Sequence, residues 1–202
     1  MKNLPTCDYG LCPPDLRETI ISTMKSVGIS DRSIGMLIDA GYFTAPAARR
    51  HHCARLGGLA LHSYNMAKRL CELSRVLGCQ WERPDGPIIV GLLHDLVKVA
   101  CYRWTGTEFI FQKVGFFDED SGKKIKPSGN HGVVSGILCN HFDIDLRDDE
   151  AACITAHMGS YGDEFEAEFY DRNVHRGAWY REVLATHMAD MIACHVDERG
   201  VR

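Results

Sequence analysis

The sequence lacks long apolar runs, an excess of basic residues and any paired-cysteine motif. No run of about 18 apolar residues occurs in its 202 residues, so we expect no membrane-spanning helix and no membrane partner. The formal net charge is -4, which argues against broad binding to duplex nucleic acid. The opening MKNLPTCDYGLCPP has no apolar core of signal-peptide length. These features predict a cytoplasmic protein of about one domain.

The nine cysteines do not predict a disulfide framework. Their number is odd, no C-x-x-C occurs, and the chain is long enough to bury a full core without staples. Cys7 and Cys12 are close in sequence, but no second pair matches them to complete a metal site. The cysteines in segments that read as helical are expected to be reduced and packed like small hydrophobic residues: Cys53, Cys71, Cys139, Cys153 and Cys194.

Helical periodicity dominates the rest of the chain. Residues 101–112 instead suggest a short hairpin, because two runs rich in aromatic residues flank the turn sequence TGT. The sequence therefore predicts an all-α helical bundle with a small β-hairpin insertion. Its helices are expected over residues 15–27, 31–40 and 59–77, from Pro87 through the HDLVKVA segment, from His131, from Asp148 or Asp149 to about His157, and over residues 178–194.

Six residues spread along the chain follow the order H…HD…H…H…D, which suits a site for two metal ions. Imidazoles and carboxylates together favour divalent transition metals, whereas magnesium or calcium prefers oxygen ligands and structural zinc prefers thiolates. One member continues an apolar helical stripe and two lie on a strongly apolar helix, so burial is expected. A buried carboxylate beside a buried imidazole is costly without a cation. The six are His62, His94, Asp95, His131, His157 and Asp190.

Other polar residues are candidates for supporting roles. Lys98 follows His94 by four residues and is expected over the same face. His187, three residues before Asp190, is expected to pack near the site and not to be a seventh ligand. A basic cluster that includes Arg50, His52 and Arg55 suits contact with a phosphate or base, or is an exposed charged surface. The segment 115–130 is either a substrate lid or a solvated loop.

The motifs around the six residues resemble those of the HD-domain metal-dependent phosphohydrolase superfamily, in the family's order. They are GGLALHS, LLHDLVK, NHGVVS, ITAHMG and THMADMIA, and they span roughly residues 43–195. FTAPAARRHH followed by GGLALHS is particularly similar to small HD proteins of bacteria and their phages. Val97 departs from the pattern, because many relatives carry Gly before the Lys. We expect an N-terminal helical extension, residues 1–42, packed on an HD domain, residues 43–202.

The resemblance implies a role for each candidate residue. His62, His94, Asp95 and Asp190 would hold one metal, and His131 and His157 would hold a second that shares Asp95. The implied cofactor is one or two divalent ions of Mn, Fe, Co, Ni or Zn. Two dications, two carboxylates and a bridging hydroxide leave a net charge of about +1, which attracts phosphate. Catalysis is expected from Asp95 and Lys98, and substrate binding from Arg50, His52 and Arg55.

The expected activity is hydrolysis of a nucleotide or another phosphate monoester or diester by a metal-bridging hydroxide. Single-stranded nucleic acid is a second class of partner, and the sequence does not define an oligomeric state. Two alternatives stay open. A di-iron oxygenase of the same superfamily, acting on a polyol or phosphonate, uses the same six ligands. A non-catalytic nucleotide-binding or assembly module would be favoured by a missing ligand, and none is missing.

Overall fold

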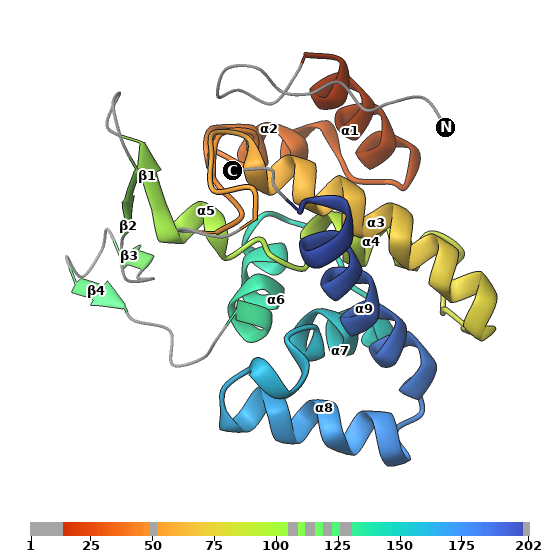
Figure 1. The fold of residues 1–202 in the computed structure, drawn as a ribbon. Helices are drawn as coiled ribbons and strands as arrows, with labels where there is room; N and C mark the ends of the chain where they lie inside the picture. The colour runs from red at the N-terminus through yellow and green to blue at the C-terminus, as the bar shows by residue number, and fades with distance from the viewer. Residues whose placement is uncertain are drawn as a thin grey trace.

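The structure, a computed structural model, describes most of the chain. In the described residues the protein is mostly helical, which confirms the predicted helical class (Figure 1). None of the helices in these segments is long and apolar enough to cross a membrane. The described segments are residues 14–48, 52–104, 109–111, 116–118, 123–125 and 131–199.

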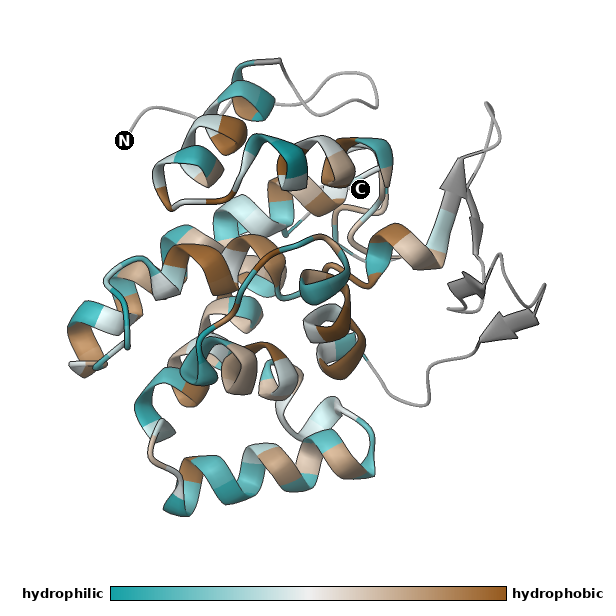
Figure 2. Cartoon of the chain, turned by 180° about the vertical axis from the view of Figure 1, so that it is seen from behind, coloured by the Kyte–Doolittle hydropathy of each residue, from teal (hydrophilic) through white to brown (hydrophobic). Residues whose placement is uncertain are grey.

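The long helix α3 (Gly58–Leu77) runs through the middle of the molecule. It packs against α4 (Gly86–Leu93) and α9 (Tyr180–Ile192), while α1 (Pro14–Ser26) and α2 (Asp31–Asp39) lie on one side of it (Figure 1). Apolar residues of α1 and α2 belong to the same core as those of α3 and α4. Figure 2 shows hydrophobic residues along α4 and hydrophilic ones on the outer sides of α1. The central helices therefore share one core.

Helices α3 and α4 approach closely because small residues lie where they cross. A Cβ atom added to Gly91 would lie 2.2 Å from the Cα atom of Ala67 and 2.6 Å from its backbone nitrogen. No side chain can fit at that distance, so a residue larger than glycine would push the helices apart. This crossing sets the separation between the residues near the start of α3 and those after the end of α4.

The helices α6 to α8 come after the short strands in the chain. Helix α6 (His131–His141) packs on α7 (Asp148–Ala156), and α8 (Glu164–Arg176) lies at the edge of the molecule against α7 and α9 (Figure 1). The 3-10 helix η1 (Gly159–Tyr161) precedes α8. A π-helix, η2 (Ala193–Asp197), directly continues α9.

Among the residues described between α4 and α6 are a short helix and four short strands. Helix α5 (Lys98–Cys101) leads into β1 (Tyr102–Trp104), which pairs antiparallel with β2 (Phe109–Phe111). Strands β3 (Phe116–Asp118) and β4 (Lys123–Ile125) form a second antiparallel pair. The other residues of segment 115–130, the candidate lid or solvated loop, lie outside the described residues.

The predicted helix from Pro87 through the HDLVKVA segment is wrong in one respect. Helix α4 ends at Leu93, residues 94–97 form a turn, and α5 resumes at Lys98. Ser135 of α6 holds this turn, because its hydroxyl oxygen accepts a hydrogen bond from the Val97 N–H at 3.1 Å. The buried Val97 has a φ of -50°, which a β-branched residue adopts without strain.

Two details of the second half of the chain were not foreseen. Helix α8 was not predicted, although Asp163 caps it by accepting a hydrogen bond from the Glu166 N–H at 2.9 Å. The N-cap of α7 is Arg147, and neither Asp148 nor Asp149 occupies that position. The side chain of Asp149 instead accepts hydrogen bonds from the Glu82 and Glu150 N–H groups.

A half-buried ion pair joins the segment before α4 to α7. The Arg83 guanidinium donates through Nε and Nη2 to the two carboxylate oxygens of Glu150, both at 2.6 Å. Glu150 is fully buried, and it also accepts a hydrogen bond from the Arg147 N–H at 2.9 Å. Because both carboxylate oxygens are partnered, the buried charge is compensated.

We expect Arg83→Ala to lower the free energy of unfolding by about 3 kcal/mol, because it leaves the Glu150 charge buried without its partner. Urea unfolding followed by circular dichroism measures this loss. Arg172→Ala is the matched control, since Arg172 pairs with Glu168 at the exposed surface of α8, and such pairs contribute less than about 1 kcal/mol. Equal losses in the two variants would contradict the interpretation.

Candidate metal centre

The predicted ligands are carried by helix ends and by the turn after α4. His62 lies in the second turn of α3, His94 is the C-cap of α4 and Asp95 follows it. His157 is the C-cap of α7, and Asp190 is in the last turn of α9. His62, His94, Asp95 and His157 are buried, so the expectation of burial for the first three is confirmed. Four separate elements thus converge on one buried point.

One group of donor atoms joins α3, α4 and α9. The Nε2 atoms of His62 and His94 are 3.1 Å apart, and Asp190 Oδ1 lies 3.2 Å from the first and 4.0 Å from the second. All three ligand atoms lie within 4.8 Å of one another. Two imidazoles and a carboxylate at this spacing can surround one metal ion.

A second group joins the turn after α4 to α7. It consists of His94, Asp95 and His157, whose ligand atoms also lie within 4.8 Å of one another. The distance between His157 Nε2 and Asp95 Oδ1 is 3.8 Å. His94 belongs to both groups, so the two candidate positions are adjacent.

Asp95 Oδ1 supplies an independent test of whether a cation fits. This oxygen is buried and has no hydrogen-bond partner among the described residues. The other oxygen, Oδ2, lies 3.7 Å from Lys98 Nζ. Burial alone would raise the pKa of Asp95, but the charge of Lys98 holds that pKa below its ordinary value. A buried carboxylate oxygen that is ionised and unpartnered is what a metal ligand requires.

Backbone carbonyls fix the tautomers of two histidines. His94 Nδ1 lies 2.9 Å from the carbonyl oxygen of Gly91, and His157 Nδ1 lies 2.7 Å from that of Ile154. A carbonyl only accepts, so each Nδ1 carries the hydrogen and each neutral ring directs an Nε2 lone pair at the cluster. Burial lowers the pKa of His94, and it lowers the pKa of His157 to about 4, which keeps both rings neutral.

Glu198 is a supporting residue that the sequence did not reveal. It is 1% exposed, and its two carboxylate oxygens lie 3.1 and 3.2 Å from His62 Nδ1. The Asn65 side-chain amide donates to Glu198 Oε1 at 3.1 Å. Burial disfavours a charged His62 ring, but the charge of Glu198 and the hydrogen bonds to both carboxylates raise its pKa well above 6.5. Nδ1 is thus engaged with Glu198, while Nε2 faces the cluster.

His131 lies near this cluster but outside both close groups. It is the first residue of α6 and is half-buried. Burial and the charge of Lys98 lower its pKa to about 4, so the ring is neutral. The first turn of α6 is held by Glu166 of α8. Its Oε1 accepts hydrogen bonds from the N–H groups of Gly132 and Val133 at 3.0 and 3.2 Å.

His187 supports the site in the way its position suggested. Its Nδ1 donates to the carbonyl oxygen of His157 at 2.8 Å. Gly159, at φ 57°, makes room for it, because a Cβ atom there would lie 2.5 Å from the His187 ring. The turn after α7 is therefore held from α9.

The predicted substrate contacts are only partly described. His52 packs beside the cluster, with its ring centroid 4.9 Å from that of His62. Arg55 is half-buried, and Arg50 lies outside the described residues. The side chains of Lys98 and Asp190 are each 14% exposed, whereas that of His94 is fully buried.

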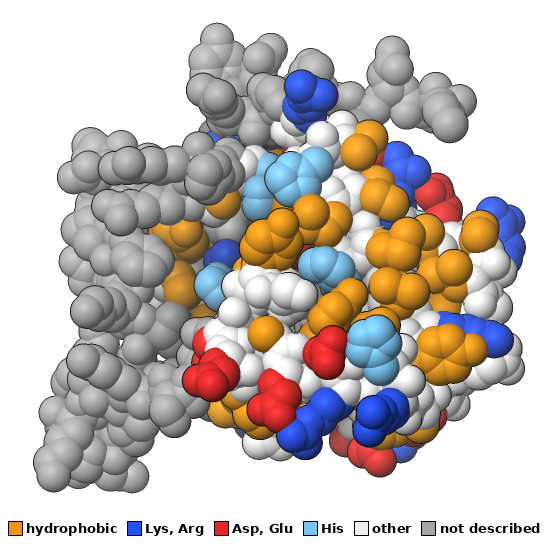
Figure 3. All heavy atoms as spheres, turned by 60° about the horizontal axis from the view of Figure 1, so that its bottom comes forward, with side chains coloured by type: hydrophobic (Ala, Val, Ile, Leu, Met, Phe, Trp, Pro, Cys, Tyr) orange, Lys and Arg blue, Asp and Glu red, His pale blue; other side chains and the backbone are white. Residues whose placement is uncertain are grey.

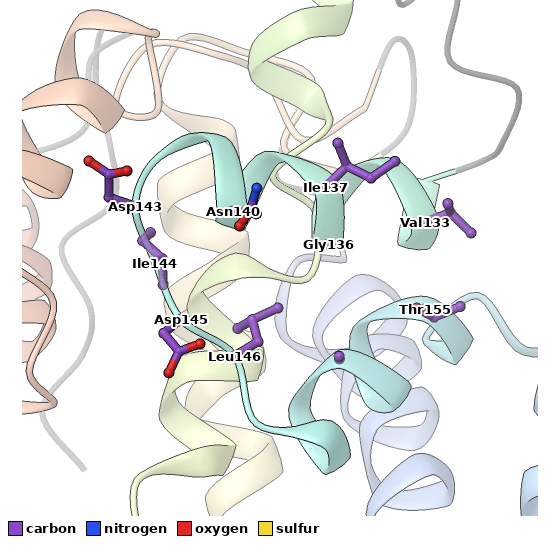
Figure 4. A pocket seen from close by; sticks show the side chains of 10 residues that line it. Val133, Gly136, Ile137, Asn140, Asp143, Ile144, Asp145, Leu146 and Thr155 are labelled. Carbon is purple, nitrogen blue, oxygen red and sulfur yellow. The ribbon is translucent and has the colours of Figure 1, made fainter.

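The surface gives two further observations. Histidine side chains reach the surface between hydrophobic ones on the face in Figure 3. A separate groove lies between α6, residues 142–147 and α7 (Figure 4), and Val133, Ile137 and Leu146 line it. None of the cluster residues lines that groove, so it is distinct from the candidate centre.

We expect Glu198→Ala to raise the dissociation constant for a divalent metal about 10- to 100-fold, because His62 loses the group that orients its ring. Competition with a metal-binding dye measures this constant. Glu18→Ala changes an exposed glutamate on α1 and is expected to bind metal like the unaltered protein. Unchanged affinity in Glu198→Ala would show that the contact does not support the site.

Comparison with known proteins finds no relative of this chain. No protein-family model, curated protein or solved structure matches it. The function must therefore be argued from the side chains of the centre itself.

Proposed function

We propose that the chain is a metal-dependent phosphohydrolase of the HD-domain type that acts on a nucleotide or another phosphate ester. One observation carries the proposal. The turn after α4 aims the His94 Nε2 lone pair and the unpartnered Asp95 Oδ1 at the same buried point. Imidazoles from α3 and α7 and the Asp190 carboxylate complete the donor set. This mixture of nitrogen and oxygen donors suits first-row transition metals.

In this proposal the six predicted residues hold two ions. His62, His94, Asp95 and Asp190 would hold one, and Asp95, His131 and His157 would hold the other. Bound ions of this kind would polarise a phosphoryl oxygen and activate a water as the nucleophile. Manganese, iron, cobalt, nickel and zinc all accept these ligands, and cellular supply decides among them.

Lys98 is the group that would act on substrate directly. Burial alone would lower its pKa, but the Asp95 carboxylate raises that pKa above the ordinary value, so the ammonium stays charged. Its side chain is partly exposed beside the cluster. A fixed positive charge there would orient a phosphoryl oxygen and stabilise the negative charge that develops during attack.

Glu198 changes the charge balance expected from the six ligands. It adds a third buried carboxylate beside the cluster, and Lys98 offsets that added charge. The centre with two dications and a hydroxide then keeps a net charge of about +1, which still attracts a phosphate dianion. Specificity would come from residues beside the metals, with Arg55 and Arg50 as substrate contacts. A small phosphate ester is the first substrate class, and single-stranded nucleic acid is the second.

Asp95→Asn is expected to abolish phosphate release and to lower metal content, because the amide keeps the size of the side chain but removes its charge. Elemental analysis gives the metal content. Release of nitrophenol or phosphate from aryl phosphates and nucleotides gives the activity, with added manganese, cobalt, nickel or iron. Asp148→Asn, at an exposed site on α7, is expected to keep both properties. Full turnover by Asp95→Asn would refute the mechanism.

Lys98→Met is expected to retain its metals and to lower kcat about 10²- to 10³-fold, because it removes a positive charge that acts on the transition state. Steady-state kinetics with metal analysis separate this effect from metal loss. Lys68→Met, at an exposed position of α3, is the matched control. A normal kcat in Lys98→Met would remove Lys98 from the mechanism. Two bound irons with oxygen uptake on polyols or phosphonates, and no hydrolysis, would favour the oxygenase alternative.

A further inference from the structure

A thiol lies directly beside the candidate metal centre. Cys194 follows Asp190 by one helical turn, and its Sγ lies 3.4 Å from Asp190 Oδ1. On its other side, the same sulfur lies 3.3 Å from His52 Nε2. None of the six predicted ligands is a cysteine, so this sulfur adds a donor of a different chemical kind.

The two distances from the sulfur suit a metal ion. A tetrahedral zinc site with bonds of about 2.3 Å to sulfur and about 2.0 Å to nitrogen separates the two ligand atoms by about 3.5 Å. The observed distances from sulfur to the His52 nitrogen and to the Asp190 oxygen are close to this value. The ligand atoms of His52, His62 and Cys194 also lie within 4.8 Å of one another.

One contact besides the one to sulfur places His52 as a ligand. Its ring packs on that of His62, with the two ring centroids 4.9 Å apart. His52 was expected to contact substrate. Its Nε2 is instead engaged with Cys194 in this structure.

We propose that His52, Cys194 and Asp190 form a third metal position with a thiolate ligand, adjacent to the two-metal centre and joined to it through Asp190. The site takes a thiophilic divalent ion, with zinc as the natural candidate. Binding there breaks the S–H bond and releases the thiol proton to solvent as the sulfur–metal bond forms. The dedicated ligands are His52 and Cys194, which the hydrolytic pair does not use.

The third metal position and its neighbour would share the Asp190 carboxylate. Asp190 Oδ1 lies 3.2 Å from His62 Nε2 and 3.4 Å from Cys194 Sγ. An ion at the thiolate position therefore draws on the carboxylate that the neighbouring position uses. The third position depends on Asp190 but not on Asp95, so the two sites can be separated by mutation.

Cobalt is the probe for this site, because bonding between thiolate sulfur and Co²⁺ gives a charge-transfer band in the near ultraviolet that nitrogen and oxygen ligands do not give. Full-length protein, stripped with a chelator, is titrated with Co²⁺ while absorbance and bound cobalt are recorded. The proposal expects the band in the unaltered protein. It expects Cys194→Ser to lose the band and one equivalent of cobalt, and Cys71→Ser, at an exposed cysteine of α3, to keep both.

His52→Asn provides a second variant that leaves the thiol in place. It is expected to move the appearance of the band to higher cobalt concentration, and thermal unfolding shows whether each variant is folded. Absence of the band in the saturated, unaltered protein would overturn the proposal. So would a band that survives in folded Cys194→Ser, or one that is unchanged in folded His52→Asn.

The outcome is independent of the hydrolase assignment. Asp95→Asn is expected to keep the sulfur–cobalt band while it loses phosphate release. A band in Asp95→Asn and in the unaltered protein, with no ester hydrolysed by either, would leave the thiolate position standing and reject the proposed function. Hydrolysis without the band would support the proposed function and reject the thiolate position.

Discussion

Two imidazole nitrogens 3.1 Å apart, in a place almost closed to water, are the constraint on which the centre depends. The Gly91 carbonyl assigns the hydrogen of the His94 ring to Nδ1, so its Nε2 is a bare lone pair. The facing nitrogen of His62 must then carry a proton, or both must bind a cation, because two lone pairs at this distance repel. Asp190 and Glu198 flank the pair and favour positive charge between them. The backbone brings the nitrogens together through the close crossing of Gly91 on Ala67.

The break in the helix after Leu93 changes where the side chains of His94 and Asp95 lie. Successive residues of an α-helix point about 100° apart, so two neighbours cannot both face one small site. In the turn at residues 94–97, His94 contributes to both groups of donor atoms, and Asp95 beside it reaches His157. The free N–H of Val97 is satisfied by Ser135 rather than by a helical carbonyl. The turn therefore costs little in hydrogen bonding and aims adjacent residues at one point.

The sequence predicted what depends on periodicity and spacing. The stripe that contains His62 and Met66 faces the core, and the helices over residues 14–26, 31–39 and 58–77 lie close to their expected bounds. The break at His94 was not predictable from a run that is apolar on nearly every side, because tertiary contact with Ser135 decides it. Helix α8 did have a local signal, the Asp163 cap with Glu166 three residues later. Glu198 had none, since its partner His62 is 136 residues away in sequence.

That separation links the centre to the folding of the whole chain. The groups that surround His62 come from α3, from the turn after α4, from α9 and from the residue after η2, so these distant segments must all be packed before the site is complete. Closing the long loops between them costs chain entropy. An ion that binds only the assembled site stabilises every element at once, since its binding free energy adds to that of global unfolding. Occupancy of the candidate centre would therefore also measure how completely these segments have packed.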